Sequence, residues 1–264
     1  MQLGILASLI STVLPAALFY SRTGVPRGIA ESVPAAAIST ILFLTLLVPQ
    51  QTRWSSAIHL AMISIACACL GVCMGIALQG NSAFSYFIVL FCYFHLSEFI
   101  LITLSHGQAK FDSLLLNHGI PYATAFAACS GEHFISPFHF PFPVSVFGGV
   151  VAVFGLSVRA VALITAGRSF THLISTKRES GHELIKSGIY SQMRHPGYCG
   201  WFFWVVGSQM LAGNPLCTLS FAIVTWRFFK ERIEYEEGLL VQIFGNHYVE
   251  YYARTKYSGV PFIS

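Results

Sequence analysis

Two short segments in the last third of the chain carry the residues best suited to chemistry. In the first, Arg194-His195-Pro196-Gly197-Tyr198 stands directly before an aromatic-rich apolar run. Proline disfavours helix at the residue before it and fits the first turn of a helix itself. His195 is therefore expected at a helix N-terminus, with polar groups free to meet a ligand. An ordinary helix start with an interfacial tyrosine explains the same residues.

The second segment, Arg227–Glu237, is rich in both positive and negative charge. On a helix, each of its basic residues would lie one turn before a glutamate. The resulting (i, i+4) pairs are Arg227 with Glu231, Lys230 with Glu234, and Arg232 with Glu236. A solvated helix end held by weak ion pairs is the alternative to a binding site here.

The elements that must position these segments are hydrophobic. Of the 264 residues, 55% are hydrophobic and only 10% are charged, whereas a soluble domain carries about 25% charged residues. The net charge of +4 is mild and gives no indication of nucleic-acid binding. The seven cysteines lie mostly in apolar runs without a CxxC pair, so we expect packing residues and no metal site. The sequence predicts an all-α polytopic membrane protein, with one membrane domain over residues 1–264.

About eight apolar runs are candidates for transmembrane helices, because a crossing needs roughly 20 residues. They are Leu3–Tyr20, Val33–Val48, Ser55–Leu78, Ser82–Ser105, Asn117–Gly131, Val144–Ala166, Tyr198–Ala212 and Leu216–Phe229. The last two are predicted to form a helical hairpin that turns at Gly213-Asn214-Pro215.

Charge is concentrated towards the C-terminus. Most Lys, Arg, Asp and Glu residues lie from Arg168 onward. Residues 1–166 are therefore predicted to be mainly membrane scaffold, and residues 167–264 to form the catalytic region. Basic residues favour the cytosolic side of a membrane, which places this region there. The stretch Thr171–Tyr190 is too polar to cross and is predicted to be a connector with short helical pieces.

Taken together, these segments resemble the isoprenylcysteine carboxyl methyltransferases of the endoplasmic reticulum. The matching pieces are YFHLSEF (93–99), HELIKSGIY (182–190), RHPGYCGWFFW (194–204), GNP (213–215), WRFFKERIEYEE (226–237) and the tail 244–263. The resemblance implies a multi-pass enzyme of that membrane with its active site facing the cytosol. It also implies transfer of a methyl group from S-adenosylmethionine to the α-carboxylate of a C-terminal S-prenylated cysteine. The product would be S-adenosylhomocysteine, and the partners would be farnesylated or geranylgeranylated proteins and the lipid bilayer.

The resemblance also implies roles for individual residues. Cofactor contacts fall on His182, Glu183, Leu184, Ile185, Tyr190, His195, Pro196, Gly197, Tyr198 and Glu236. Substrate binding and catalysis fall on Arg232. The family usually has serine where this chain has Gly197, and it often has glutamine where this chain has Ser175.

The implied reaction agrees with the residues present. A C-terminal carboxylate has a pKa of about 3.3–3.7 and is ionised at neutral pH, so no general base is required. The planar guanidinium of Arg232 is suited to hold such a carboxylate.

Three other functions compete with this interpretation. A phospholipid N-methyltransferase would use the same methyl donor and a similar histidine–proline motif. A membrane sterol reductase would need a nicotinamide cofactor, and the chain has no Gly-rich phosphate loop. A non-enzymatic transporter would favour repeats and broken helices at the membrane midplane, whereas the polar groups here gather at one face.

Overall fold

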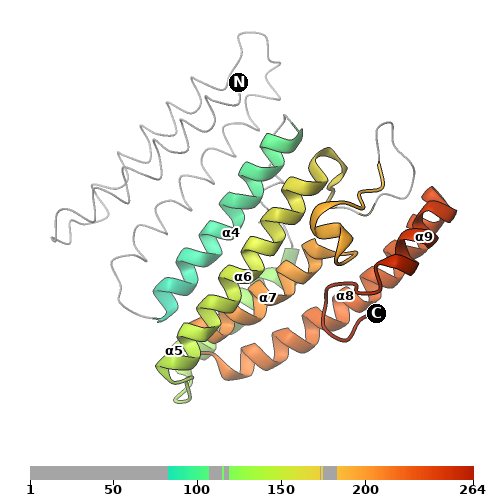
Figure 1. Ribbon diagram of the computed structural model, residues 1–264. Coiled ribbons are helices and arrows are strands. Elements are labelled where there is room, and N and C mark those ends of the chain that lie inside the picture. Colours follow the sequence, from blue (N-terminus) through green and yellow to red (C-terminus); the bar gives the residue numbers. More distant parts are fainter. Residues whose placement is uncertain (1–82, 107–114, 116–118, 173, 175–182) are drawn as a thin grey trace, which may run out of the picture. The chain divides into compact units, whose positions relative to one another are not determined.

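A computed structural model describes residues 83–106, 115, 119–172, 174 and 183–264 (Figure 1). The predicted spans Leu3–Tyr20, Val33–Val48 and Ser55–Leu78 lie outside these residues. In the part of the chain that is described, every regular element is a helix, which agrees with the predicted all-α fold class. The chain divides into two compact units, Met1–Ile120 and Pro121–Ser264.

In the first unit, the described helix is α4, Ala83–His106. Its residues Ala83–Ser105 are long and apolar enough to cross a membrane, and they coincide with the predicted span Ser82–Ser105. Two ionisable side chains within it, His95 and Glu98, are 0% and 2% exposed. The His95 ring packs edge-on against Phe91 of the preceding turn, with 4.5 Å between the ring centroids.

The other described α-helices lie in the second unit, except that the first two residues of α5 belong to the first unit (Figure 1). They are α5 (Gly119–Ile135), α6 (Phe142–Ala166), α7 (Pro196–Ala212), α8 (Pro215–Phe244) and α9 (Asn246–Arg254). The last four predicted spans therefore all fall on helices. Of these helices, α6 with its short extension, Phe142–Ser169, is long and apolar enough to cross a membrane. The total of about eight spans stays a prediction.

In the described part of the predicted connector Thr171–Tyr190, one short helical piece is present, the 3-10 turn that begins at Gly188. One 3-10 turn, Gly167–Ser169, ends α6, and a second, Gly188–Ser191, precedes α7. Gly167 and Gly188 both adopt positive φ, at 54° and 59°, a conformation that costs glycine little. These turns bring the connector back beside the start of α7.

Glycines allow the backbones of α6 and α7 to touch. A Cβ atom on Gly200 would lie 2.6 Å from both Gly155 O and Arg159 N, so no larger residue fits without moving backbone. The backbones of α6 and α7 therefore pack in direct contact at Gly200. Arg159 of α6 then reaches the first turn of α7, where its Nη1 donates to Gly197 O at 3.0 Å and its guanidinium lies 4.7 Å from the Trp201 ring centroid.

We expect Gly200→Ala to destabilise the protein by about 1–3 kcal/mol, because the added methyl group would overlap backbone atoms of α6. The matched control is Gly238→Ala in α8, where a Cβ atom would have nothing within 4 Å and alanine improves helix propensity. Thermal unfolding in detergent measures both. Equal melting temperatures for the two variants would contradict the close contact.

The turn between α7 and α8 falls at Gly213-Asn214-Pro215, as predicted. Gly213 ends α7 in the left-handed conformation, with φ 80°, and Pro215 occupies the first turn of α8. From α5, the Glu132 carboxylate accepts the N–H groups of Leu216 and Cys217 at 2.7 and 2.6 Å. A carboxylate at this position satisfies the free amides of a helix start and complements its dipole.

Past its apolar half, α8 continues without a break through Arg227–Glu237 to Phe244. The helix predicted for this charged segment is therefore confirmed, and it carries the segment to the start of α7. Arg227 pairs with Glu231 at 3.0 Å, as its spacing indicates, with both side chains largely exposed. After a turn at Gly245, the short helix α9 follows, and the chain ends in the non-helical tail 255–264.

Candidate active site

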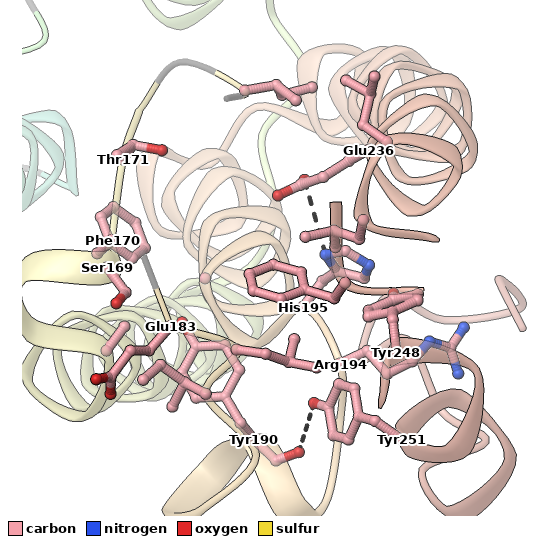
Figure 2. Close-up of a pocket in the computed structure, with 18 of the residues that line it drawn as sticks. Ser169, Phe170, Thr171, Glu183, Tyr190, Arg194, His195, Glu236, Tyr248 and Tyr251 are labelled. Atoms are coloured by element: carbon pink, nitrogen blue, oxygen red, sulfur yellow. Dashed lines mark hydrogen bonds and ion pairs between the residues drawn. The ribbon is translucent and has the colours of Figure 1, made fainter. Parts of the chain in front are cut away.

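A pocket opens where the connector, the start of α7, the charged half of α8 and helix α9 meet (Figure 2). Most of the predicted cofactor residues line it. These are Glu183, Leu184, Ile185, Tyr190, His195, Gly197, Tyr198 and Glu236. Pro196 is buried as the first residue of α7 and does not form the wall. His182 lies outside the described residues.

His195 is the residue that precedes α7, as the proline after it predicts. Its ring lies between two carboxylates: Nε2 is 3.0 Å from Glu237 Oε1, and Nδ1 is 3.8 Å from Glu236 Oε2. An ionised carboxylate can only accept a hydrogen bond, so the Nε2–H group donates to Glu237. Figure 2 shows Glu236 and His195 facing each other across one side of the pocket.

Glu237 also holds a buried arginine. Arg194 Nε donates to the same oxygen, Glu237 Oε1, at 2.7 Å, and the Arg194 side chain is 0% exposed. The Arg194 guanidinium lies 4.1 Å from the centroid of the Tyr252 ring. Burial alone would raise the pKa of Glu237, but the hydrogen bonds from His195 and Arg194 outweigh it and hold this pKa below its ordinary value. Glu237 is therefore ionised at neutral pH.

Tyr198 connects the predicted substrate residue to the pocket. Arg232 Nε donates to the Tyr198 hydroxyl at 2.8 Å, and that hydroxyl donates to Glu236 Oε2 at 2.6 Å. The Tyr198 ring is stacked between His195 and Phe229, with centroid distances of 5.4 and 4.9 Å. Packing on both faces fixes the ring, and with it the position of the hydroxyl between the arginine and the carboxylate.

Arg232 does not form the direct pair with Glu236 that the helical spacing predicts, because Tyr198 lies between them. A second donor, Arg232 Nη2, bonds to the His172 carbonyl in the connector at 2.8 Å. Arg232 is thus held beside the pocket but does not line it. The other predicted pair of this helix also fails to form, since the Lys230 ammonium lies 5.7 Å from the Trp226 ring centroid instead of meeting Glu234.

The tyrosines of α9 close one side of the pocket. Tyr251 donates its hydroxyl to Tyr190 O at 2.6 Å, a contact drawn in Figure 2. Burial raises the pKa of Tyr251 to about 12, so this hydroxyl stays protonated at neutral pH and remains a donor. The connector is thereby tied to α9.

Several residues of the site were not predicted from the sequence. Glu237, Arg194, Tyr248 and Tyr251 were given no site role, and neither was the apolar wall of Leu239, Leu240 and Phe244. One signal was available for the tyrosines, because a spacing of three residues puts Tyr248 and Tyr251 on the same face of a helix. For the apolar wall, the signal is the change of α8 from charged to apolar residues after Glu237.

This arrangement suits a ligand with both polar and ring-shaped parts. One carboxylate, Glu237, is held by Arg194 and His195, while the partners of Glu236 among the described residues are the Tyr198 hydroxyl and the distant His195 ring. Glu236 can therefore accept hydrogen bonds from ligand hydroxyls or face a cationic group. Aromatic and leucine side chains in the same wall offer apolar surface.

Known proteins are similar to this chain in sequence. The family model of the isoprenylcysteine carboxyl methyltransferases matches residues 148–242, from α6 into the last turns of α8. A protein-S-isoprenylcysteine O-methyltransferase of Xenopus laevis is 34% identical over 266 aligned positions, which cover 97% of this chain and 91% of that protein. Protein-S-isoprenylcysteine O-methyltransferase B of Arabidopsis thaliana is 45% identical over 179 positions, 65% of this chain and 89% of the relative.

A solved structure shares the fold. It is the eukaryotic intramembrane Ras methyltransferase, an isoprenylcysteine carboxyl methyltransferase, which superposes with a TM-score of 0.75 at 29% identity. The match covers 98% of this chain and 95% of that one. Sequence and fold agree over nearly the full length, and the chain belongs to the isoprenylcysteine carboxyl methyltransferase family.

Proposed function

We propose that this protein transfers a methyl group from S-adenosylmethionine to the α-carboxylate of a C-terminal S-prenylated cysteine. We place it in the endoplasmic reticulum membrane with the pocket facing the cytosol. The observation that carries the proposal is the hydrogen-bonded chain Arg232–Tyr198–Glu236. Arg232 suits a substrate carboxylate, and Glu236 suits the cofactor. The Tyr198 hydroxyl bonds to both and so fixes their relative positions.

The residues of the pocket fit S-adenosylmethionine. Glu236 would accept hydrogen bonds from ribose hydroxyls and offset the positive charge of the cofactor. Tyr190, Tyr248 and Leu240 offer apolar surface for the adenine ring. When bound, the cofactor supplies an electrophilic methyl group on a sulfonium centre.

The chain's own contribution to the reaction is orientation and exclusion of water. The acceptor carboxylate is already ionised, so the site has no proton to remove. Holding reactants in the right geometry can supply about 7–11 kcal/mol of a barrier. Arg232 is preset for this task, because Tyr198 and the His172 carbonyl fix its Nε and Nη2 atoms. Its remaining Nη hydrogens are left to hold the acceptor.

A prenyl acceptor also accounts for a membrane fold around the pocket. The prenyl chain partitions into the bilayer and confines the acceptor to the membrane surface. Its transfer energy of about 0.8 kcal/mol per CH₂ is released at that step. Binding in the enzyme therefore depends mainly on the depth at which the lipid holds the carboxylate. Arg232 lies just past Phe229, where α8 changes from apolar to charged residues.

The direct test is transfer of labelled methyl groups from S-adenosylmethionine to small acceptors in liposomes. We expect S-farnesyl and S-geranylgeranyl N-acetylcysteine to be methylated, and N-acetylcysteine and the carboxamide of S-farnesyl cysteine to stay unlabelled. Equal labelling of N-acetylcysteine would contradict the role of the lipid. Preferential labelling of phosphatidylethanolamine would replace the proposal with a phospholipid N-methyltransferase.

Binding of S-adenosylhomocysteine should weaken in His195→Ala and Tyr190→Ala, because both side chains line the pocket. The His195 ring also bonds to Glu237, and the Tyr190 hydroxyl donates to Ala162 O at 3.5 Å. We expect a rise in Kd of at least about tenfold, or 1.4 kcal/mol, for each variant. Calorimetry on the purified protein measures it. The matched control is His247→Ala, an exposed histidine of α9 that does not line the pocket. Unchanged affinity in both pocket variants would remove the cofactor assignment.

A further inference from the structure

The tail after α9 is bonded to the residues that lead into α7. The N–H groups of Arg194 and His195 donate to the carbonyls of Tyr257 and Ser258 at 3.0 and 2.8 Å. Arg194 Nη1 donates to the Thr255 carbonyl at 2.7 Å. His195 precedes the helix, so no helical carbonyl is available to its N–H group. The tail supplies the acceptor.

The tail is itself anchored on α8. Val260 is 3% exposed and packs in one apolar cluster with Phe229 and Ile233. Beside it, Trp226 Nε1 donates to the Pro261 carbonyl at 2.8 Å. The segment thus links the apolar interior of α8 to the backbone of the pocket residue His195.

Gly259 of the tail lies against the start of α7. Its φ of 108° is a conformation that other residues rarely adopt. A Cβ atom there would lie 2.9 Å from Met193 Sδ, 3.1 Å from Cys199 Cβ and 3.4 Å from His195 O. Glycine therefore meets both a conformational and a steric requirement.

We propose that Tyr257–Val260 is a positioning element of the pocket. It fixes the backbone of Arg194 and His195, and so sets the His195 ring against Glu237 and Glu236. The segment itself touches no ligand, since the described pocket wall includes none of its residues. The inference rests on the proposed function in one respect: its binding test uses S-adenosylhomocysteine, the product of the proposed reaction.

The first test compares Gly259→Ala with Gly238→Ala, whose added methyl group meets nothing within 4 Å. We expect Gly259→Ala to reduce kcat by about tenfold to a hundredfold, since misplacement of a site by about 1 Å has effects of this size. We also expect its Kd for S-adenosylhomocysteine to rise, while Gly238→Ala behaves as the wild type. Wild-type kcat and Kd in Gly259→Ala would overturn the proposal.

A second measurement needs no ligand and separates positioning from general destabilisation. Amide hydrogen exchange in Gly259→Ala should accelerate at residues 193–199, where the N–H groups of Arg194 and His195 lose their acceptors. The distant hairpin turn at Gly213 should exchange as in the wild type. Exchange that accelerates equally in both places would assign the tail a merely structural role. If the wild type failed to bind S-adenosylhomocysteine, the cofactor proposal would fall. Hydrogen exchange would still decide whether Tyr257–Val260 positions the pocket.

Rescue in trans provides the third test. Removal of residues 257–264 should abolish binding of S-adenosylhomocysteine, and the free peptide YSGVPFIS should restore it at high concentration. The same peptide with alanine in place of Gly259 is the control and should not restore binding. Wild-type affinity in the truncated protein, or restoration by both peptides, would overturn the proposal. Should the truncated protein not fold, the Gly259→Ala comparison decides.

Discussion

Replacing Glu237 by glutamine is expected to destabilise the protein by about 3–5 kcal/mol, the range found when one partner of a buried ion pair is removed. The reason is the Arg194 side chain, which is 0% exposed and relies on Glu237 Oε1 at 2.7 Å. Without the carboxylate, Arg194 is left as a buried charge without a counterion. His195 loses its charged acceptor as well, so cofactor affinity should fall together with stability.

The matched control is Glu231→Gln on the same helix. Its partner Arg227 is held at 3.0 Å, but the side chains are 78% and 66% exposed for Arg227 and Glu231. An exposed pair contributes less than about 1 kcal/mol. Thermal unfolding in detergent measures both variants, and equal melting temperatures would contradict the assigned role of Glu237.

The pH dependence of this difference has a definite sign. The pKa of Glu237 is lowered in the folded protein from its ordinary value of 4.5. The stability that it contributes is therefore fully present above that value and is lost as the pH falls through the lower, folded pKa. The gap in melting temperature between wild type and Glu237→Gln should persist across neutral pH and close only in acid.

Arg232→Lys is expected not to restore the activity that Arg232→Ala loses. The guanidinium uses two different nitrogens, Nε for Tyr198 and Nη2 for the His172 carbonyl, each at 2.8 Å. A lysine ammonium is a single point and cannot make both bonds while also holding a carboxylate. We expect the rate of methyl transfer to fall at least about tenfold, or 1.4 kcal/mol, with cofactor binding largely kept.

The matched control here is Arg227→Lys, which makes the same exchange at an exposed position of the same helix. Its rate should equal that of the wild type. Rates of labelled methyl transfer to S-farnesyl N-acetylcysteine distinguish the variants. Full activity in Arg232→Lys would mean that charge alone matters at this position.

Prediction from the sequence succeeded where a local rule decides the outcome. Pro196 and Pro215 fix helix starts, because proline restricts its own φ angle. Gly213 fixes a helix end, because glycine readily adopts the positive φ required there. The charged segment after Phe229 continues α8 because nothing in it interrupts a helix. The expected Arg232–Glu236 pair failed for a nonlocal reason: the Tyr198 hydroxyl, from another helix, offers partners to both side chains.

The sequence by itself therefore determined the all-helical class of the described part and the hairpin turn, because proline, glycine and apolar run length act within a few residues. Tertiary structure alone decided which side chains complete the site. Glu237 became the partner of Arg194 and His195, and the tail at Ser258 became the acceptor for the His195 N–H group. Each of these contacts joins residues more than forty positions apart. Their geometry depends on how α7, α8 and the tail pack, and no spacing along the chain encodes it.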